Sequence, residues 1–342
     1  GGSYASRFNS RAADHPSVKF SVGQRSPSAA SSQTDSVTSS CVRSVPRLSV
    51  ATMNTNDQSI LVIGASGTGK THYGVQLLGR LRQRCSTTLA LDGPIDDLTA
   101  FEEGLRALEM GTAAEHTAQR TYQAVQLGLR NEEGALLRVV WPDYGGEQIK
   151  DVINQRSLND RWQHELQGTR RWILFIRPAA LTDRVDLEAV VTRLQAGTSS
   201  RSQRNALVHP WDSWDENAKL IELLQIFLHF ADCSTARPIS TPRLAVMLSC
   251  WDELPQEQQA RGPQAVLAQA LPLLTQFIDA NWQRSAWATW GLSSLGRALP
   301  KGGIDKEFAL TGPEHAGYVI MPEGEHNDDL TLPLKWLVDV RA

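Results

Sequence analysis

Long hydrophobic runs are missing from this chain of 342 residues. No apolar stretch approaches the roughly 20 residues that a helix needs to cross a bilayer, so the sequence predicts no transmembrane helix. No internal repeat is visible either. What the chain does have is an ordinary globular composition, with 41% hydrophobic and 21% charged residues. That composition is sufficient to bury a sizeable core in one large domain or two small ones.

Cysteine is scarce, and the four cysteines are scattered along the chain at Cys41, Cys85, Cys233 and Cys250. None has a Cys-x-x-Cys neighbour or a histidine at metal-ligand spacing, which argues against a zinc site. Four separate thiols in a chain of this length are typical of a reduced, cytoplasmic protein.

An excess of basic residues is also lacking, since the formal net charge is −3. The charge is uneven: residues 1–52 contain six basic and two acidic side chains, a net of +4, so the remainder carries −7. A mildly acidic body argues against nucleic acid as the main partner, because phosphate backbones bind to basic surfaces.

Residues 1–52 differ from the rest of the chain. They contain 14 serines and almost no periodic apolar pattern, so they cannot bury enough surface to offset the entropy cost of ordering. We expect a disordered leader or extension; an Arg- and Ser-rich organellar transit peptide is the alternative. The predicted domain boundary places the folded domain at residues 53–342.

After Met53 the pattern alternates between short apolar strands and amphipathic helices. This alternation predicts an α/β protein with a three-layer P-loop NTPase fold, in which a mostly parallel central sheet carries helices on both faces. The expected strands are 59–64, 87–91, 121–129, 135–141, 172–176, 244–248 and 287–292, and the expected helices are 71–84, 95–110, 146–167, 215–230, 264–281 and 330–340.

The strongest motif follows the first expected strand and matches G-x-x-x-x-G-K-[ST]. Its glycines allow a tight loop whose N–H groups point at phosphate oxygens. Lys70 brings a cation to the β- and γ-phosphates, and Thr71 offers a hydroxyl to Mg²⁺. We therefore predict a nucleotide-binding P-loop made of Gly64, Ala65, Ser66, Gly67, Thr68, Gly69, Lys70 and Thr71.

A second motif, D-x-x-G, places Asp143 after a hydrophobic strand, where its carboxylate could reach a metal-bound water. In GTPases the glycine of this motif, here Gly146, contacts the γ-phosphate and senses its presence. A threonine between the two motifs should complete the Mg²⁺ shell. Of Thr112, Thr117 and Thr121 we favour Thr117, because it leads towards the strand that begins near residue 121.

Two further strand ends could recognise the base. GTPases have [N/T]-K-x-D after the later strand, and here the tetrad is Ser-Cys-Trp-Asp, with Asp252 in place but Ser for Asn and no Lys. Cys250 or Trp251 could supply the missing packing. About 40 residues on, GLSSLG places Ser293 and Ser294 where GTPases have a loop against the guanine oxygen. Order and spacing together favour guanine over adenine.

These motifs resemble those of translation-factor-related (Ras-like) P-loop GTPases, specifically the bacterial double-GTPase families of conflict and defence systems. The resemblance covers Gln58 to the C-terminus and rests on GASGTGKT, DYGGE, SCWDEL, GLSSLG and the terminal helix around Leu334–Trp336. It implies GTP and GDP as ligands, Mg²⁺ as cofactor, and a second GTPase or an effector as protein partner. Glu147 stands where many GTPases have a water-orienting Gln, so we expect it to act on the attacking water as a base or an acceptor.

Three functions remain open on these residues. The first is an active GTPase switch, in which Lys70, Glu147 and Thr117 are catalytic. The second is a nucleotide-binding interaction module with weak or no hydrolysis, which reports GTP to a partner. The third is a P-loop kinase or ATPase, against which the Asp252 tetrad argues.

Overall fold

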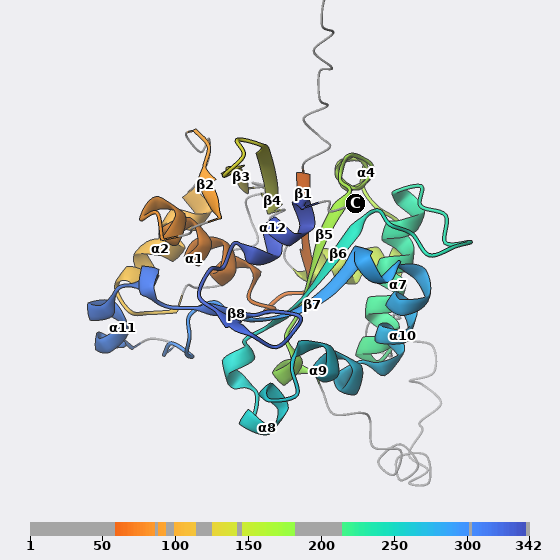
Figure 1. Ribbon diagram of the computed structural model, residues 1–342. Helices are drawn as coiled ribbons and strands as arrows, with labels where there is room; N and C mark the ends of the chain where they lie inside the picture. Colours follow the sequence, from red (N-terminus) through yellow and green to blue (C-terminus); the bar gives the residue numbers. More distant parts are fainter. Residues whose placement is uncertain are drawn as a thin grey trace, which may run out of the picture. The chain divides into compact units, whose positions relative to one another are not determined.

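The computed structural model describes residues 59–85, 88–93, 99–113, 125–141, 146–181, 214–300 and 303–339. Within these residues nine strands form one central sheet. The strand order is β2-β3-β4-β1-β5-β6-β7-β8-β9 (Figure 1). The bounds are β1 Ser59–Gly64, β2 Leu89–Leu91, β3 Val125–Asn131, β4 Leu136–Trp141, β5 Arg171–Ile176, β6 Arg243–Ser249, β7 Trp287–Ser293, β8 Tyr318–Ile320 and β9 His326–Asn327. The predicted leader, residues 1–52, lies outside the described residues.

The sheet is mixed, which corrects the prediction of a mostly parallel sheet. Its five central strands, β4-β1-β5-β6-β7, are parallel. The pairs β2–β3, β3–β4, β7–β8 and β8–β9 are antiparallel. A short turn forces an antiparallel pair: β3 and β4 are joined across residues 132–135, where Asn131 Oδ1 accepts from Ala135 N at 2.7 Å. Strands β8 and β9 are too short to show a pattern in the sequence.

Helices cover both faces of the sheet, as predicted. Their bounds are α1 Lys70–Arg82, α2 Thr99–Glu109, α3 Gly146–Gln155, α4 Asp160–Gly168, α7 Glu216–Phe230, α8 Gln256–Gln259, α9 Pro263–Ala270, α10 Pro272–Asn281, α11 Lys306–Thr311 and α12 Leu332–Val338. Single 3₁₀ turns occur at η2 Pro178–Ala180, η4 Trp251–Glu253, η5 Arg284–Ala286 and η6 Pro313–His315.

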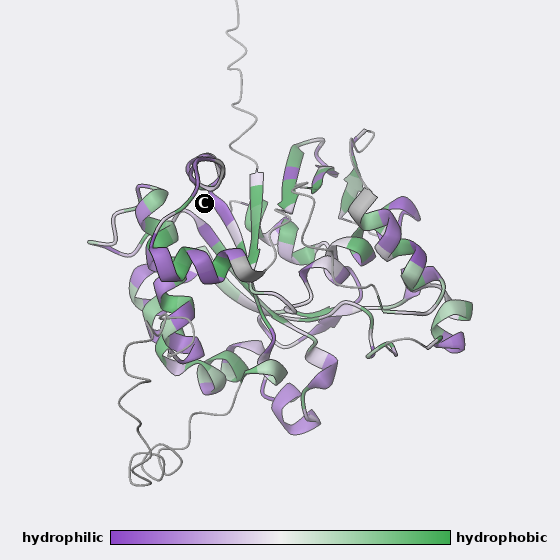
Figure 2. Cartoon of the chain, turned by 180° about the vertical axis from the view of Figure 1, so that it is seen from behind, coloured by the Kyte–Doolittle hydropathy of each residue, from purple (hydrophilic) through white to green (hydrophobic). Residues whose placement is uncertain are grey.

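Alternation along β1 shows how the two faces are filled. Ile60 and Val62 belong to the core under α1, α2 and α12, whereas Leu61 and Ile63 belong to the core under α3, α4, α7, α9 and α10. A strand buried on both faces needs apolar side chains in both directions, which explains the continuous run SILVIG. The hydropathy colouring shows hydrophobic strands at the centre and more hydrophilic outer helices (Figure 2).

Two of the expected helices are each broken in two. The range 146–167 divides into α3 and α4, because Asn159 caps the second helix: its Oδ1 accepts from Trp162 N at 2.9 Å, as a helix N-terminus requires. The range 264–281 divides into α9 and α10 at Pro272, which lacks the N–H that a continuous helix would need. No helix in the described ranges combines the length and apolarity required to cross a membrane.

Candidate functional site

The P-loop joins β1 to α1. Gly69 lies directly before the helix with φ 79° and ψ 7°, a left-handed conformation that glycine adopts without a steric penalty. Helical hydrogen bonding starts at once, since Tyr73 N donates to Gly69 O at 3.0 Å. The strand, the sharp loop and the helix N-terminus therefore follow one another as the motif predicts, and the positive end of the helix dipole faces the loop.

Lys70 folds back over this loop. Its ammonium donates to the carbonyl oxygens of Gly64 and Ala65 at 2.6 and 2.7 Å. The hydroxyl of Thr68 donates to Ala65 O at 2.8 Å, which ties the loop together. The arrangement brings a cation and a helix N-terminus together at one short loop, and such a site can bind phosphate oxygens.

Thr71 is half-buried in the first turn of α1, and the end of β4 packs against this turn. There the indole Nε1 of Trp141 donates to Lys70 O at 3.3 Å. The strand that precedes the predicted acid Asp143 thus ends beside the helix that carries Thr71. A hydroxyl and a carboxylate are hard oxygen donors of the kind that Mg²⁺ prefers, so the donor set fits this ion.

Several predicted site residues lie outside the described residues, namely Thr117, Thr121 and Asp143. Gly146 and Glu147 begin α3, but the description does not extend to their side chains. Thr112 is described, and its hydroxyl donates to Ala107 O at 3.0 Å, at the C-terminal end of α2. That bond gives Thr112 a structural part in closing the helix, so it is a weaker candidate for a switch threonine than Thr117.

The tetrad after β6 turns sharply. Cys250 has φ 52°, and the 3₁₀ turn η4 follows. Trp251 is only 1% exposed, and a Cβ added to Gly291 of β7 would lie 2.8 Å from its ring. Trp251 is therefore a core residue. Cys250 and Ser249 both lie beside the P-loop: Cys250 Sγ is 3.9 Å and Ser249 Cβ 3.7 Å from where a Cβ of Gly69 would be. Burial, followed by the charge of Glu253, raises the pKa of the Cys250 thiol to about 11.

Asp252 and Ser293, which the sequence analysis proposed separately as base contacts, come together from the ends of the neighbouring strands β6 and β7. The Ser293 hydroxyl donates to Asp252 Oδ1 at 2.5 Å and accepts from Gly296 N at 3.0 Å. Ser293 is fully buried. We call these two residues the Asp252–Ser293 pair. One carboxylate oxygen is engaged by this hydroxyl, and the carboxylate as a whole is an acceptor-only group. Ser294, the next residue, is half-buried.

Tyr318 completes the surroundings of this pair and was missed by the sequence reasoning. It lies opposite Ser293 in the β7–β8 ladder. Burial, followed by the charge of Asp252, raises the pKa of Tyr318, and a hydrogen bond with Ser293 opposes that shift. The three-residue strand that holds Tyr318 has no sequence pattern by which it could have been found.

Arg177 is the second residue that the sequence reasoning missed. It follows β5, and its Nε and one terminal nitrogen donate to the two carboxylate oxygens of Glu253 at 2.9 and 2.5 Å. Its other terminal nitrogen donates to Gly67 O of the P-loop at 3.5 Å. The hydrogen bonds that Arg177 donates to Glu253 raise the pKa of Arg177. Strands β1, β5 and β6 are parallel neighbours, so their carboxyl ends meet at one edge, where ligands of open α/β sheets bind.

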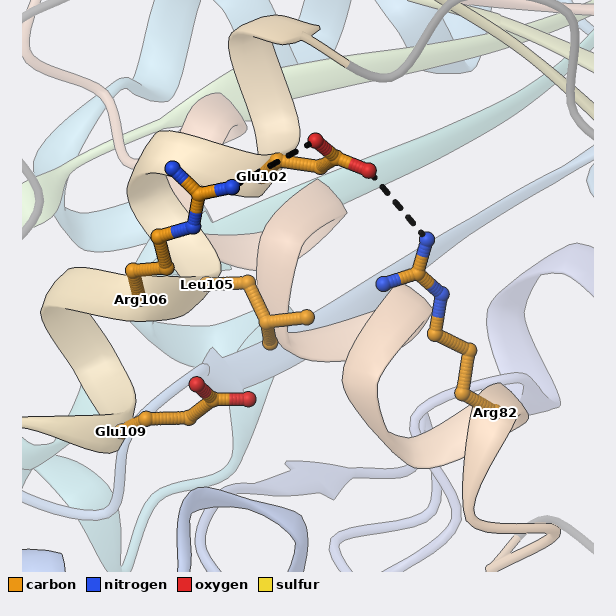
Figure 3. Close-up of a pocket in the computed structure, with 5 residues that line it drawn as sticks. All are labelled: Arg82, Glu102, Leu105, Arg106 and Glu109. Carbon is orange, nitrogen blue, oxygen red and sulfur yellow. Dashed lines mark ion pairs between the residues drawn. The ribbon is translucent and has the colours of Figure 1, made fainter.

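A separate depression of about 180 Å³ lies between α1 and α2 and is lined by Arg82, Glu102, Leu105, Arg106 and Glu109 (Figure 3). Glu102 points at both arginines, with nitrogen–oxygen distances of 3.9 Å to each. Arg82 is the last residue of α1 and Lys70 the first, so the helix separates them by about 18 Å at 1.5 Å per residue. This depression is therefore not part of the P-loop site.

Among the described residues, no group of three or more His, Cys, Asp or Glu side chains could hold a metal ion. Cys85, Cys233 and Cys250 are free thiols, so they form no disulfide with one another.

Solved structures with a similar arrangement are GTPases and GTPase-like domains. A bacterial selenocysteine-specific elongation factor, EF-Sec, is 14% identical over 70% of this chain and 26% of that one, with a TM-score of 0.30. The GTPase-like domain of Ski7 from S. cerevisiae, bound to GTP, is 13% identical over 72% and 46%, with a TM-score of 0.31. The signal recognition particle receptor complex SRb-GTP/SRX from Chaetomium thermophilum is 13% identical over 74% and 96%, with a TM-score of 0.27.

The chain spans about a quarter of the elongation factor and just under half of the Ski7 chain. At these TM-scores the likenesses carry no argument about ligand or activity. No curated protein matches the sequence significantly. The family description Double-GTPase 1 does match, over residues 61–337, a range that runs from β1 through the P-loop and the Asp252–Ser293 pair to α12. The chain therefore belongs to the Double-GTPase 1 family.

Proposed function

We propose that this protein binds GTP with Mg²⁺ and hydrolyses it to GDP and phosphate, and thereby acts as a nucleotide-dependent switch. The observation that carries the proposal is the meeting of two different binding groups at one sheet edge. The cationic P-loop, with Lys70, suits phosphates, and the Asp252–Ser293 pair offers a half-buried carboxylate acceptor that suits the guanine edge.

The P-loop residues have separate tasks in this proposal. Lys70 and the N–H groups of the loop bind the β- and γ-phosphate oxygens, and the helix dipole of α1 adds to their attraction. Thr71 and Asp143 would hold Mg²⁺, whose chemistry is to neutralise charge on the β- and γ-oxygens. Thr117 would add a ligand from the first switch, and the amide of Gly146 would contact the γ-phosphate.

The Asp252–Ser293 pair recognises the base. Guanine presents N1–H and N2–H₂ on one edge, and a carboxylate accepts from both, whereas adenine presents an acceptor and a C–H there. The Ser293 hydroxyl holds the carboxylate in place, and the backbone after it, at Ser294, would face the guanine oxygen. This arrangement also argues against a P-loop ATPase or kinase.

Hydrolysis requires a water to be positioned against the γ-phosphate. Glu147 takes that role in our proposal, accepting a hydrogen bond or a proton from the water. Its carboxylate also supports a second candidate function, in which the protein binds GTP, turns it over weakly or not at all, and regulates a partner. The negative charge of this carboxylate would repel the negatively charged γ-phosphate and so slow hydrolysis, whereas a neutral glutamine amide would not.

Single-turnover phosphate release separates these two functions. The protein would be loaded with GTP, and release measured after Mg²⁺ is added for wild type, Glu147→Gln and Asp143→Ala, with the exposed Glu323→Gln as control. Our proposal expects both site variants to release phosphate more slowly, Glu147→Gln with unchanged GTP affinity. GTP binding with no release in the wild type would favour the regulatory module, and a wild type that does not bind GTP would refute both.

The proposal also includes a cellular role, a protein partner and a location. The resemblance to defence-associated double GTPases supports a role in bacterial defence signalling, with a second GTPase or an effector as partner. The free thiols support a cytoplasmic location. Co-purification of the full chain in the presence of GTP and of GDP tests the partner: a protein retained with one nucleotide and not the other is expected of a switch.

A further inference from the structure

The tetrad that recognises the base has no lysine, yet the site does not lack a cation there. We propose that Arg177 is a nucleotide-binding residue whose guanidinium covers one face of the purine, in the place that a tetrad lysine at position 250 would occupy. This inference rests on the proposed GTP-binding function and adds a binding residue from a different strand.

The position of Arg177 is the first support. It hydrogen-bonds to Gly67 O in the P-loop and to Glu253, the residue after Asp252. The hydrogen bond to Glu253, together with the negative charges of Glu253 and Asp252, raises the pKa of Arg177. A nucleotide with phosphates on the P-loop and its base edge on Asp252 must bridge these two loops, and Arg177 already connects them through its hydrogen bonds to Gly67 and Glu253.

The orientation of the guanidinium is the second support. The Glu253 carboxylate accepts hydrogen bonds from Arg177 Nε and from one terminal nitrogen at 2.9 and 2.5 Å. Gly67 O accepts a hydrogen bond from the other terminal nitrogen at 3.5 Å. All three nitrogens are therefore fixed through the edge of the planar group, while the side chain remains 35% exposed. The cation–π contacts among the described residues involve Arg243 and Arg284, so no described ring is stacked on Arg177.

A guanidinium that is held through its edge, and on which no described ring is stacked, is suited to a purine. Arginine is more weakly hydrated than lysine and stacks on aromatic faces, including nucleobases. Stacking does not read the hydrogen-bonding edge of the base, because every base has a π-face. Arg177 should therefore add affinity for purine nucleotides, while discrimination between guanine and adenine stays with Asp252.

The test compares ligands with and without a base. Binding of GTP and of inosine triphosphate to the full chain is measured by calorimetry, and tripolyphosphate is titrated as a competitor of GTP. Arg177→Met removes the charge and the planar face but keeps the length of the side chain. Arg130→Met is the matched control, because Arg130 also pairs with a carboxylate, that of Asp92. Arg130 lies opposite the first residue of β4, at the edge of the sheet that is opposite the P-loop.

We expect Arg177→Met to weaken GTP and inosine triphosphate by the same factor, about tenfold for a stacking cation. Tripolyphosphate should compete within twofold of wild type, and Arg130→Met should change none of the three. Unchanged GTP affinity in Arg177→Met, or an equal loss for tripolyphosphate, would overturn the inference and leave GTP binding by the wild type standing. A wild type that binds no GTP would refute the proposed function itself.

A second variant tests whether positions 177 and 250 serve the same place. Cys250→Lys is made in the wild type and in Arg177→Met. If the two cations occupy one place, the lysine restores GTP affinity in Arg177→Met and adds little in the wild type. Equal effects in both backgrounds, including no effect in either, would show that the positions are independent and would overturn the shared place.

Discussion

The P-loop is held by contacts between near neighbours in the chain, whereas the Asp252–Ser293 pair joins residues that are 41 positions apart. In the P-loop, Lys70 bonds to carbonyls five and six residues before it. The Asp252–Ser293 pair exists only because β6 and β7 lie side by side with Trp251 buried between their ends. A site of the first kind depends on local backbone, and a site of the second kind depends on the sheet.

The difference predicts how each part fails. Changes in the P-loop should remove binding of all phosphates and leave the fold alone. Changes at the Asp252–Ser293 pair should alter which base is bound. Changes in the core around Trp251 should instead lower the free energy of unfolding. The four variants below are arranged by the size of their expected effect on GTP affinity.

Lys70→Ala should have the largest effect. The lysine would make charge-assisted hydrogen bonds to two phosphate oxygens, each worth about 1.5–3 kcal/mol, so we expect GTP affinity to fall about a thousandfold. Tripolyphosphate binding should be lost as well, and the thermal unfolding midpoint should match wild type. The exposed Lys306→Ala is the control. Wild-type affinity in Lys70→Ala would show that the loop does not bind phosphate.

Asp252→Asn should come next and should change the specificity. One acceptor becomes an NH₂ donor that faces the guanine amine, so we expect about a hundredfold loss for GTP. Xanthine has a carbonyl oxygen at that position, so xanthosine triphosphate should gain affinity. Competition binding of both nucleotides measures the exchange. If neither affinity changes, Asp252 does not touch the base.

Ser293→Ala should be weaker, because it removes a positioning group rather than a ligand contact. Asp252 loses the 2.5 Å bond that orients it, and Gly296 N loses its acceptor. A loss of about 1–1.5 kcal/mol, or about tenfold, is expected for GTP, with tripolyphosphate unaffected. Thr275→Val, which deletes another buried hydroxyl, should leave GTP affinity unchanged. A loss shared by tripolyphosphate would contradict the positioning role.

Gly291→Ala should have the smallest effect on nucleotide affinity and act mainly on the fold. The added Cβ would lie 2.8 Å from the Trp251 ring and 3.0 Å from Ile320 Cβ. Overpacking of this kind costs about 1–3 kcal/mol in the free energy of unfolding, which urea denaturation measures. Wild-type stability would mean that Trp251 moves freely, and the sheet would then place no constraint on Asp252.

The same contrast explains what the sequence could predict. The P-loop was predictable because its residues are contiguous and each has a chemical reason. Asp252 and Ser293 were proposed from the order and spacing of the motifs, and the parallel strands that precede them end at one edge. Arg177 was missed because a single arginine after a strand has no pattern, and its role depends on reaching Gly67 and Glu253 from another part of the chain. The antiparallel edge formed by β8 and β9 was missed because these strands are only three and two residues long.

The most direct test of the account is competition between GTP and ATP for the wild-type protein in the presence of Mg²⁺. Two hydrogen bonds from the guanine edge to Asp252 are worth about 1.5–3 kcal/mol each, so GTP should bind at least about a hundredfold more tightly than ATP. Repeating the competition without Mg²⁺ should weaken both nucleotides and keep the ratio, because the metal contacts only the phosphates. Equal affinities for GTP and ATP would contradict the assignment of the Asp252–Ser293 pair to guanine.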